Sequence, residues 1–139
     1  MNIKLKTEGI GLTSNNAVII GSGILNALGL RPSKDIDVIV TEEKYKELSV
    51  NSNLRKGEIR GKEVLKDDLF EIGISWSVLS KTWSFNDLIG QSVIIDGIRY
   101  ITIQFLLSVK KSWLANGESR DKDIEDIKLI ENYLKSVRI

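Results

Sequence analysis

Residues 17–40 combine two short apolar runs with a glycine-containing turn between them, and this segment constrains the fold most strongly. Residues 17–20 (Ala-Val-Ile-Ile) predict a buried strand, and Gly21-Ser22-Gly23 predicts a tight turn at its end. Residues 24–28 follow as a short helix that Gly29 ends. Residues 35–40 begin with strict alternation and continue with β-branched side chains, which predicts a second strand. Such a strand–helix–strand unit indicates an α/β or α+β domain.

The rest of the sequence adds further strands and ends in two helices. We expect a polar helix that Thr41 caps and that ends near residue 48, then a modest strand over 57–66 and a buried strand over 69–74. A short helix over 84–90 and a hairpin of 93–95 and 99–101 around Asp96-Gly97 should follow. The last two elements are helices over 103–114 and 120–137, and Ser119 is the expected cap of the second. This order predicts a mixed β-sheet with flanking helices and a C-terminal helix pair, in one domain over residues 1–139.

The composition restricts the chemistry that the chain can perform. Its 139 residues include no cysteine and no histidine, which excludes Cys/His zinc sites, cysteine nucleophiles and Ser-His-Asp triads. Any reaction must therefore use carboxylates, lysines, hydroxyls, backbone amides and a hard metal ion.

Charge and hydropathy restrict the partners. The net charge is +1 and no segment resembles a basic arm, so we expect no extended nucleic-acid surface and no membrane contact. The first residues lack the apolar core of a signal peptide, and no apolar run reaches membrane-spanning length. We therefore expect a soluble, cytoplasmic protein.

Two aspartates at the start of the second predicted strand are candidate metal ligands. Residues two apart in a strand face the same side, so Asp35 and Asp37 present their carboxylates to one place. Magnesium takes one or two carboxylates together with substrate phosphates. The amides and hydroxyl around Gly21 and Ser22, where a strand turns into a helix, suit a phosphate group.

Each part of this pattern also has a structural explanation. Gly-Ser after a strand can be a simple turn, and Asp-x-Asp at a strand start can be a solvated edge. Together, within one strand–helix–strand unit, they favour a binding site. Two carboxylates on one face repel each other and need a cation nearby.

The two C-terminal helices carry charged residues on their apolar faces. At a period of 3.6 residues, Lys110 and Asp123 fall on inner faces, Arg120 lies at the margin, and Lys111 points away. The apolar residues that define these faces are Leu106, Leu107, Leu114, Ile127, Ile130, Leu134 and Val137. Since buried charges need partners, Lys110, Arg120 and Asp123 either contact a ligand or form a structural Lys110–Asp123 ion pair.

A family resemblance rests on these same residues. Gly21-Ser22, twelve further residues and then Asp35-Ile36-Asp37-Val38 resembles the motif of the nucleotidyltransferase superfamily related to DNA polymerase β. The surrounding segment is most similar to small bacterial members, which include antibiotic, abortive-infection and toxin–antitoxin nucleotidyltransferases. Residues 120–123 (Arg-Asp-Lys-Asp) also resemble the Arg-x-Lys-Asp that ends many small members of this superfamily.

The resemblance implies a third carboxylate on a later strand, which acts as base toward the acceptor hydroxyl. Glu71 is the matching position, although the family more often has Asp there; Asp67 and Asp68 are alternatives, and an edge acid facing water is the structural explanation. Magnesium at Asp35 and Asp37 is the implied cofactor. Gly21, Ser22, Lys110 and Arg120 are the candidate nucleotide-binding residues, with Asp123 supporting them.

These features predict metal-dependent transfer of a nucleoside monophosphate from a nucleoside triphosphate, with ATP as the expected donor, to a hydroxyl acceptor. The alternative is a non-catalytic scaffold with this fold that binds a protein partner in the manner of an antitoxin. The small size of the chain and the Glu at the third position favour that alternative.

Overall fold

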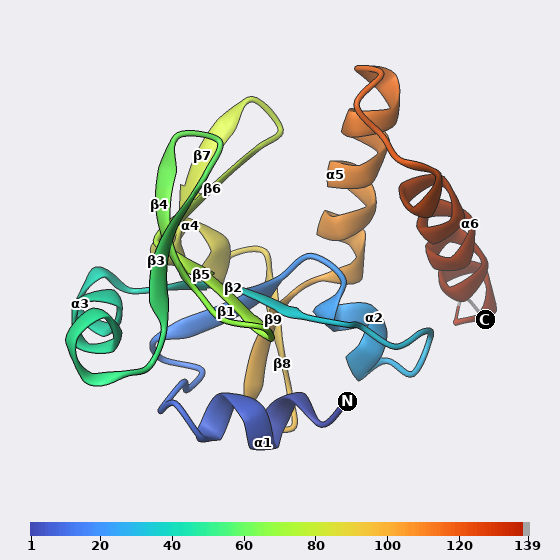
Figure 1. Cartoon of the computed structure of the whole chain (residues 1–139). Helices are drawn as coiled ribbons and strands as arrows, with labels where there is room; N and C mark the ends of the chain where they lie inside the picture. Colours follow the sequence, from blue (N-terminus) through green and yellow to red (C-terminus); the bar gives the residue numbers. More distant parts are fainter. Residues whose placement is uncertain (138–139) are drawn as a thin grey trace.

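The computed structural model describes residues 1–137, and Figure 1 shows how their elements are arranged. The helices are α1 (Ile3–Glu8), α2 (Gly23–Ala27), α3 (Glu42–Asn51), α4 (Phe85–Ile89), α5 (Ile103–Ala115) and α6 (Asp121–Ser136). The strands are β1 (Ala17–Ile20), β2 (Ile36–Val40), β3 (Arg55–Ile59), β4 (Lys62–Lys66), β5 (Phe70–Gly73), β6 (Ser75–Val78), β7 (Lys81–Ser84), β8 (Ser92–Ile95) and β9 (Ile98–Ile101).

A mixed sheet is the centre of the molecule. Within the described residues it has seven strands in the order β3-β4-β5-β2-β1-β9-β8, while β6 and β7 form a separate hairpin. Helices α5 and α6 lie side by side along one edge of the molecule (Figure 1). The predicted mixed sheet with flanking helices and a C-terminal helix pair is therefore confirmed.

The central strands form because they are almost entirely apolar. All four residues of β1 are buried, and β2 is buried except at Asp37. Strand β1 pairs antiparallel with β2, and β2 pairs parallel with β5. This register places Asp37 beside Glu71, and β4 places Lys66 on the other side of Glu71. Because directly opposed residues share one face of a sheet, a row of charged side chains crosses it.

Two hairpins differ from the sequence prediction. The single strand predicted over 57–66 is wrong, because β3 and β4 are separate strands joined at Arg60-Gly61, where φ is 50° and 81°. The β6–β7 hairpin was not predicted at all. Its turn residues Leu79 and Ser80 both have positive φ, at 54° and 59°, although leucine and serine rarely adopt this conformation. The predicted β8–β9 hairpin at Asp96-Gly97 is confirmed.

The helix boundaries follow their capping residues. Thr41 and Ser84 accept hydrogen bonds from backbone N–H groups and cap α3 and α4, as predicted for Thr41. Ser119 as the cap of α6 is wrong. The N-cap is Arg120, whose backbone N–H donates to the Asp123 carboxylate at 3.0 Å. The short helix α1, which Asn2 caps, was not predicted.

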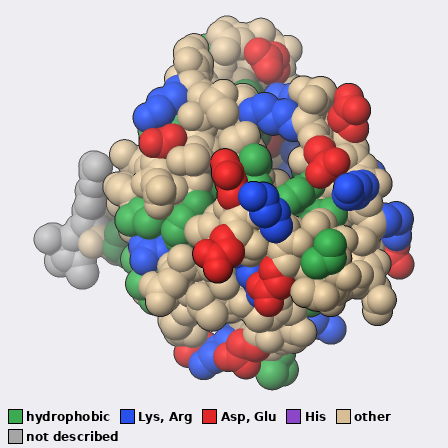
Figure 2. Space-filling model, turned by 90° about the vertical axis from the view of Figure 1, so that its left-hand side faces the viewer, with side chains coloured by type: hydrophobic (Ala, Val, Ile, Leu, Met, Phe, Trp, Pro, Cys, Tyr) green, Lys and Arg blue, Asp and Glu red, His purple; other side chains and the backbone are tan. Residues whose placement is uncertain are grey.

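The inner faces of α5 and α6 are correctly predicted except near their C-terminal ends. Leu106, Ile127 and Ile130 are buried. Leu114 and Val137 are 45% and 54% exposed, because they lie at the ends of their helices, beyond the segments that pack on the core. None of the helices within residues 1–137 is long and apolar enough to cross a membrane. On the face of the molecule shown in Figure 2, acidic and basic side chains are interspersed.

Candidate active site

A cleft of about 470 Å³ opens over one face of the sheet. Strands β1, β2, β4 and β5 contribute to it, together with the β6–β7 hairpin, α5 and the start of α6. Seven of the eight candidate site residues line this cleft, namely Gly21, Ser22, Asp35, Asp37, Glu71, Lys110 and Arg120. The eighth, Asp123, is buried and accepts a hydrogen bond from Lys110.

Three carboxylates in the cleft influence one another. Burial, the neighbouring Glu71 and then Asp35 raise the pKa of Asp37 to about 7. Burial and Asp35 also raise the pKa of Glu71, and Lys66 beside it partly offsets this. The cause is the register of β2 and β5, which places Asp37 and Glu71 on adjacent strands, with Asp35 two residues before Asp37. Within residues 1–137, none of the three carboxylates forms an ion pair with a lysine or an arginine.

Such a donor set suits a hard divalent cation. Carboxylate oxygens are the ligands that magnesium prefers. A cation would stabilise the buried Asp37 carboxylate and offset its repulsion from Glu71 and Asp35, which together raise the pKa of Asp37. Within residues 1–137, no group of three or more acidic side chains is already closed around a single point. Because magnesium usually keeps several waters and takes substrate oxygens, one or two protein carboxylates are enough to fit it.

The turn after β1 lies directly against the carboxylates. Gly21 has a φ of 64°, and a Cβ atom on it would lie 3.1 Å from Oδ2 of Asp37. The backbone conformation therefore favours glycine, and an added Cβ would crowd the Asp37 carboxylate. The hydroxyl of Ser22 bonds that of Ser33 at 3.0 Å, and Ser33 donates to the backbone carbonyl of Asp35. These contacts connect the turn to the loop that carries the first aspartate.

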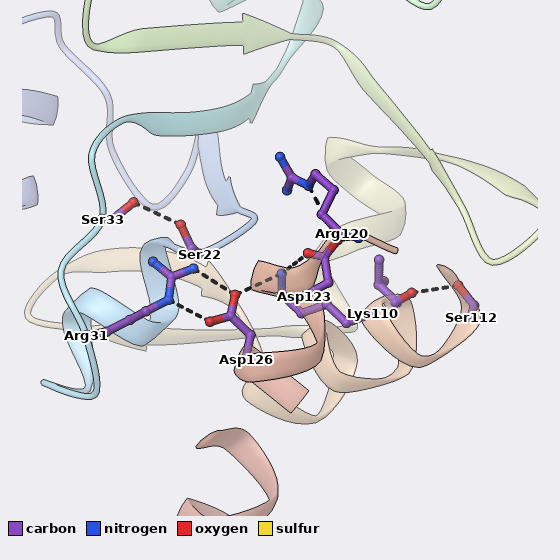
Figure 3. A network of polar contacts seen from close by, with 9 residues as sticks. Ser22, Arg31, Ser33, Lys110, Ser112, Arg120, Asp123 and Asp126 are labelled. Carbon is purple, nitrogen blue, oxygen red and sulfur yellow. Dashed lines mark hydrogen bonds and ion pairs between the residues drawn. The ribbon is translucent and has the colours of Figure 1, made fainter. Parts of the chain in front are cut away.

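A buried polar network lies behind this loop, and Figure 3 shows it. The ammonium of Lys110 lies 2.7 Å from Asp123 and 3.1 Å from Asp126. The guanidinium of Arg31 donates two hydrogen bonds of 2.7 Å to the two oxygens of Asp126. Burial alone would raise the pKa of Asp126, but the bonds from Arg31 and Lys110 outweigh it and hold the pKa below its ordinary value.

The network separates the roles of the basic candidates. The Lys110 ammonium is buried between two carboxylates, so the structure contains the ion pair that the sequence offered as one alternative. Arg120 is different, because its side chain is 74% exposed and lies 3.5 Å from Asp123. Arg120 and Lys122 both line the cleft, and their charges act to lower the pKa of Asp37. Both cations are therefore available to an anionic ligand beside the aspartates.

Sequence reasoning missed Arg31, Asp126 and Lys122 as parts of this region. Asp126 lies three residues after Asp123 and so shares its helix face, which the helical period could have revealed. The pairing of Arg31 with Asp126 spans 95 residues and gives no local signal. The alternative carboxylates for Glu71 do not line the cleft. Asp67 caps the turn before β5 through Leu69 and Phe70, and the Asp68 side chain is fully exposed.

Comparison with known proteins identifies the fold. No family model and no curated protein matches the sequence. The chain is similar to the solution structure of the antibiotic-resistance factor ANT(2'')-Ia, an aminoglycoside nucleotidyltransferase, with a TM-score of 0.58. The two chains are 18% identical, and the similarity covers 95% of this chain and 80% of that one. The chain therefore has a nucleotidyltransferase-like fold.

Proposed function

We propose that this chain is a metal-dependent nucleotidyltransferase, which transfers a nucleoside monophosphate from a nucleoside triphosphate to a hydroxyl acceptor. The observation that carries the proposal is the group of Asp35, Asp37 and Glu71, which line one cleft beside the Gly21–Ser22 turn. Burial, together with repulsion from Glu71 and Asp35, raises the pKa of Asp37 to about 7. This arrangement is difficult to explain as a structural feature, because it destabilises the folded chain at neutral pH. The similarity in fold to an aminoglycoside nucleotidyltransferase supports the same reaction class.

The donor half of the site would consist of the Gly21–Ser22 turn and the basic start of α6. The Ser22 hydroxyl and the neighbouring amides would hold the β- and γ-phosphates, and Arg120 and Lys122 supply positive charge on the other wall of the cleft. Asp35 and Asp37 would hold magnesium. When bound, the metal neutralises charge on the transferring and leaving oxygens.

Glu71 would act on the acceptor. A new bond forms between the acceptor oxygen and the α-phosphorus, and the bond from that phosphorus to the oxygen of pyrophosphate breaks. The proton of the acceptor hydroxyl passes to the Glu71 carboxylate. Burial and Asp35 raise the pKa of Glu71, which brings this carboxylate closer to the range where it serves as a general base.

Thermal unfolding tests the donor half without knowledge of the acceptor. Wild type and the Asp35→Ala/Asp37→Ala double variant are heated with ATP, GTP, CTP or UTP, each with and without magnesium. We expect a magnesium-dependent stabilisation of wild type, about 2.7 kcal/mol at a ligand concentration 100 times Kd, that the double variant lacks. ATP is the expected donor, and the four nucleotides establish the base preference.

The competing function is a non-catalytic scaffold of the same fold that binds a protein partner. It predicts that no nucleotide, with or without magnesium, changes the unfolding temperature. That result would contradict the proposed transferase. Equal stabilisation of wild type and the double variant would instead show that Asp35 and Asp37 take no part in nucleotide binding.

A further inference from the structure

The end of the cleft away from the aspartates contains a second group of basic side chains. We infer that this group, Lys62 with Arg60, binds a phosphate group of the acceptor, so that the acceptor is a phosphorylated molecule and not a polycation. The inference rests on the proposed function for the identity of the acceptor. The phosphate site itself can be measured independently.

Lys62 is a half-buried cation without a counter-ion. Its ammonium donates to the hydroxyl of Ser77 at 2.6 Å and to that of Ser75 at 3.2 Å. Within residues 1–137 it has no carboxylate partner within 4.0 Å. Lysine has three N–H donors, so one remains for a ligand. All three side chains line the cleft, and the two hydroxyls hold the ammonium in place without neutralising it.

Arg60 adds a second cation at the same end. It occupies the β3–β4 turn with a φ of 50°, a conformation that costs energy for a residue with a side chain. It lines both the cleft and an adjoining hollow of about 400 Å³ between the β6–β7 turn and the end of α5. Lys81 and Glu118 also line that hollow. In this hollow two cations therefore face one carboxylate.

The acidic residues of the β3–β4 hairpin lie on one face of it, opposite the face that carries Lys62 and Lys66. Lys62 and Lys66 alternate with Val64 on the face that contributes to the cleft. Glu58 and Glu63 pair with each other on the opposite face, where Glu63 accepts a hydrogen bond of 2.7 Å from the Tyr45 hydroxyl. The acidic residues of the hairpin are thereby kept away from the cleft, which leaves this wall positive.

The strand order places these cations on the acceptor side. An in-line displacement needs the attacking and leaving oxygens on opposite sides of the phosphorus. In the proposed site the leaving pyrophosphate lies toward the Gly21–Ser22 turn after β1. The sheet continues from β1 through β2 and β5 to β4, so the opposite side is that of Glu71 and then of Lys62.

The distance also fits a phosphate next to an acceptor hydroxyl. Lys66 at the end of β4 lies beside Glu71, and Lys62 is the first residue of the same strand, four residues before Lys66. At about 3.3 Å per residue, the two positions are roughly 13 Å apart along the strand. A sugar with a phosphate ester, reached from both ends by side chains several ångströms long, spans such a gap. A polycationic acceptor would instead meet two uncompensated positive charges.

Ribose 5-phosphate and ribose form a matched pair of probes, because they share their hydroxyls and differ by the phosphate. Wild-type protein is first saturated with magnesium and α,β-methylene-ATP, which cannot be cleaved at the reacting bond. Each probe is then titrated in by calorimetry, and kanamycin represents polycationic acceptors. We expect ribose 5-phosphate to bind at least 10-fold more tightly than either ribose or kanamycin.

Variants locate the phosphate. Lys62→Met should weaken binding of ribose 5-phosphate at least 10-fold and leave binding of the ATP analogue unchanged. Arg60→Asn should weaken binding of ribose 5-phosphate to a smaller extent. Asparagine tolerates positive φ and so keeps the turn, which makes this variant a second test if Lys62→Met fails to fold. Lys56→Met is the control, since Lys56 is exposed and pairs with Leu65 on the opposite face of the same hairpin.

The outcomes separate this inference from the proposed function. Equal binding of ribose 5-phosphate to wild type and Lys62→Met, or tighter binding of kanamycin, would overturn the phosphate site. Failure of the ATP analogue to bind would instead contradict the transferase, and ribose 5-phosphate can then be titrated into the protein alone. A short 5′-phosphorylated oligoribonucleotide tests whether the phosphate belongs to a nucleic-acid end or to a free sugar phosphate. If the acceptor is a nucleic-acid end, the oligoribonucleotide should bind more tightly than ribose 5-phosphate.

Discussion

The pKa of Asp37 makes the metal-free protein sensitive to pH. This carboxyl has a pKa of about 7 when folded and 3.8 in a model compound, so the folded state holds the proton more tightly. Stability from this group is therefore complete below pH 4 and is lost as the pH rises through 7. Above that pH, the folded chain must keep an ionised Asp37 next to Glu71 and Asp35.

Asp37→Asn removes this titration. Without metal, we expect the variant to be more stable than wild type above pH 7, on the order of 1–3 kcal/mol, and close to wild type near pH 4. Urea unfolding of both proteins at pH 4.5, 6 and 8 measures the difference in stability, in which the pH dependence of groups that do not interact with Asp37 cancels. MgATP should reverse the order at pH 8, because only wild type keeps the ligand. A stability difference between the two proteins that does not change with pH would show that the pKa of Asp37 is not raised in the folded state.

Two adjacent lysines on α5 should differ in their contribution to stability. Lys110 is buried against Asp123 and Asp126, whereas Lys111 pairs with Glu131 while both side chains are about half exposed. Lys110→Met leaves buried carboxylates uncompensated and should cost roughly 3–5 kcal/mol. Lys111→Met should cost about 0–1 kcal/mol. Chemical denaturation of both variants tests this, and equal losses would mean that the buried network is not formed as described.

At the scale of elements, the packing of α2 on β1 fixes the turn that contacts Asp37. Gly23 begins α2, and a Cβ atom there would overlap Cγ2 of Ile19. Gly23→Ala should therefore push α2 away from the sheet and destabilise the protein by about 1–3 kcal/mol. It should also weaken the stabilisation by MgATP, because Ser22 is the preceding residue.

Gly90→Ala is the matched control for Gly23→Ala. Gly90 has a φ of −67°, and the nearest atom to an added Cβ is 4.0 Å away, so alanine fits without strain. We expect a change between zero and a gain of about 1 kcal/mol, with nucleotide binding unaffected. Thermal unfolding of both variants with and without MgATP provides the measurement. Equal behaviour of the two glycine variants would contradict the close packing of α2.

The elements that the sequence predicts best are those with strong local signals. Residues 17–20 form a buried run, and Asp96-Gly97 is a turn that accepts positive φ at both positions. The hairpins at Arg60-Gly61 and Leu79-Ser80 escaped prediction because three of these four turn residues carry side chains that disfavour positive φ. The β6–β7 hairpin packs Trp76 and Trp83 against Phe105 of α5.

At the scale of the whole molecule, long-range contacts complete the site. The spacing of Asp35 and Asp37 is a local property, so the sequence alone predicts that their carboxylates face one place, whereas Glu71 was expected only from the family resemblance. The contact of Arg31 with Asp126 depends on how α6 packs, and no period in the sequence encodes it. This contact joins the loop before β2 to the helix that begins at the basic residues 120–122.

A bound nucleotide should therefore strengthen the connection between the sheet and the C-terminal helix pair. Helix α6 packs mainly on α5, and Arg31 provides a polar contact from it to the loop before β2. A triphosphate that contacts Ser22 and Asp37 on one side and Arg120 on the other would bridge both parts. Residues 120–122 are exposed, and segments with few buried contacts open most easily, so these residues at the start of α6 have protection to gain.

Hydrogen exchange with and without MgATP measures this bridging. We expect slower exchange in residues 21–37 and also in the first turns of α6, with little change in the distant β8–β9 hairpin as an internal control. In the Arg120→Ala variant, we expect the nucleotide to protect residues 21–37 but not α6. Asp35 and Asp37 are still present in this variant, whereas the contact between the nucleotide and the start of α6 is lost. Protection confined to residues 21–37 in wild type would mean that the nucleotide binds the sheet alone and that α6 takes no part in the donor site.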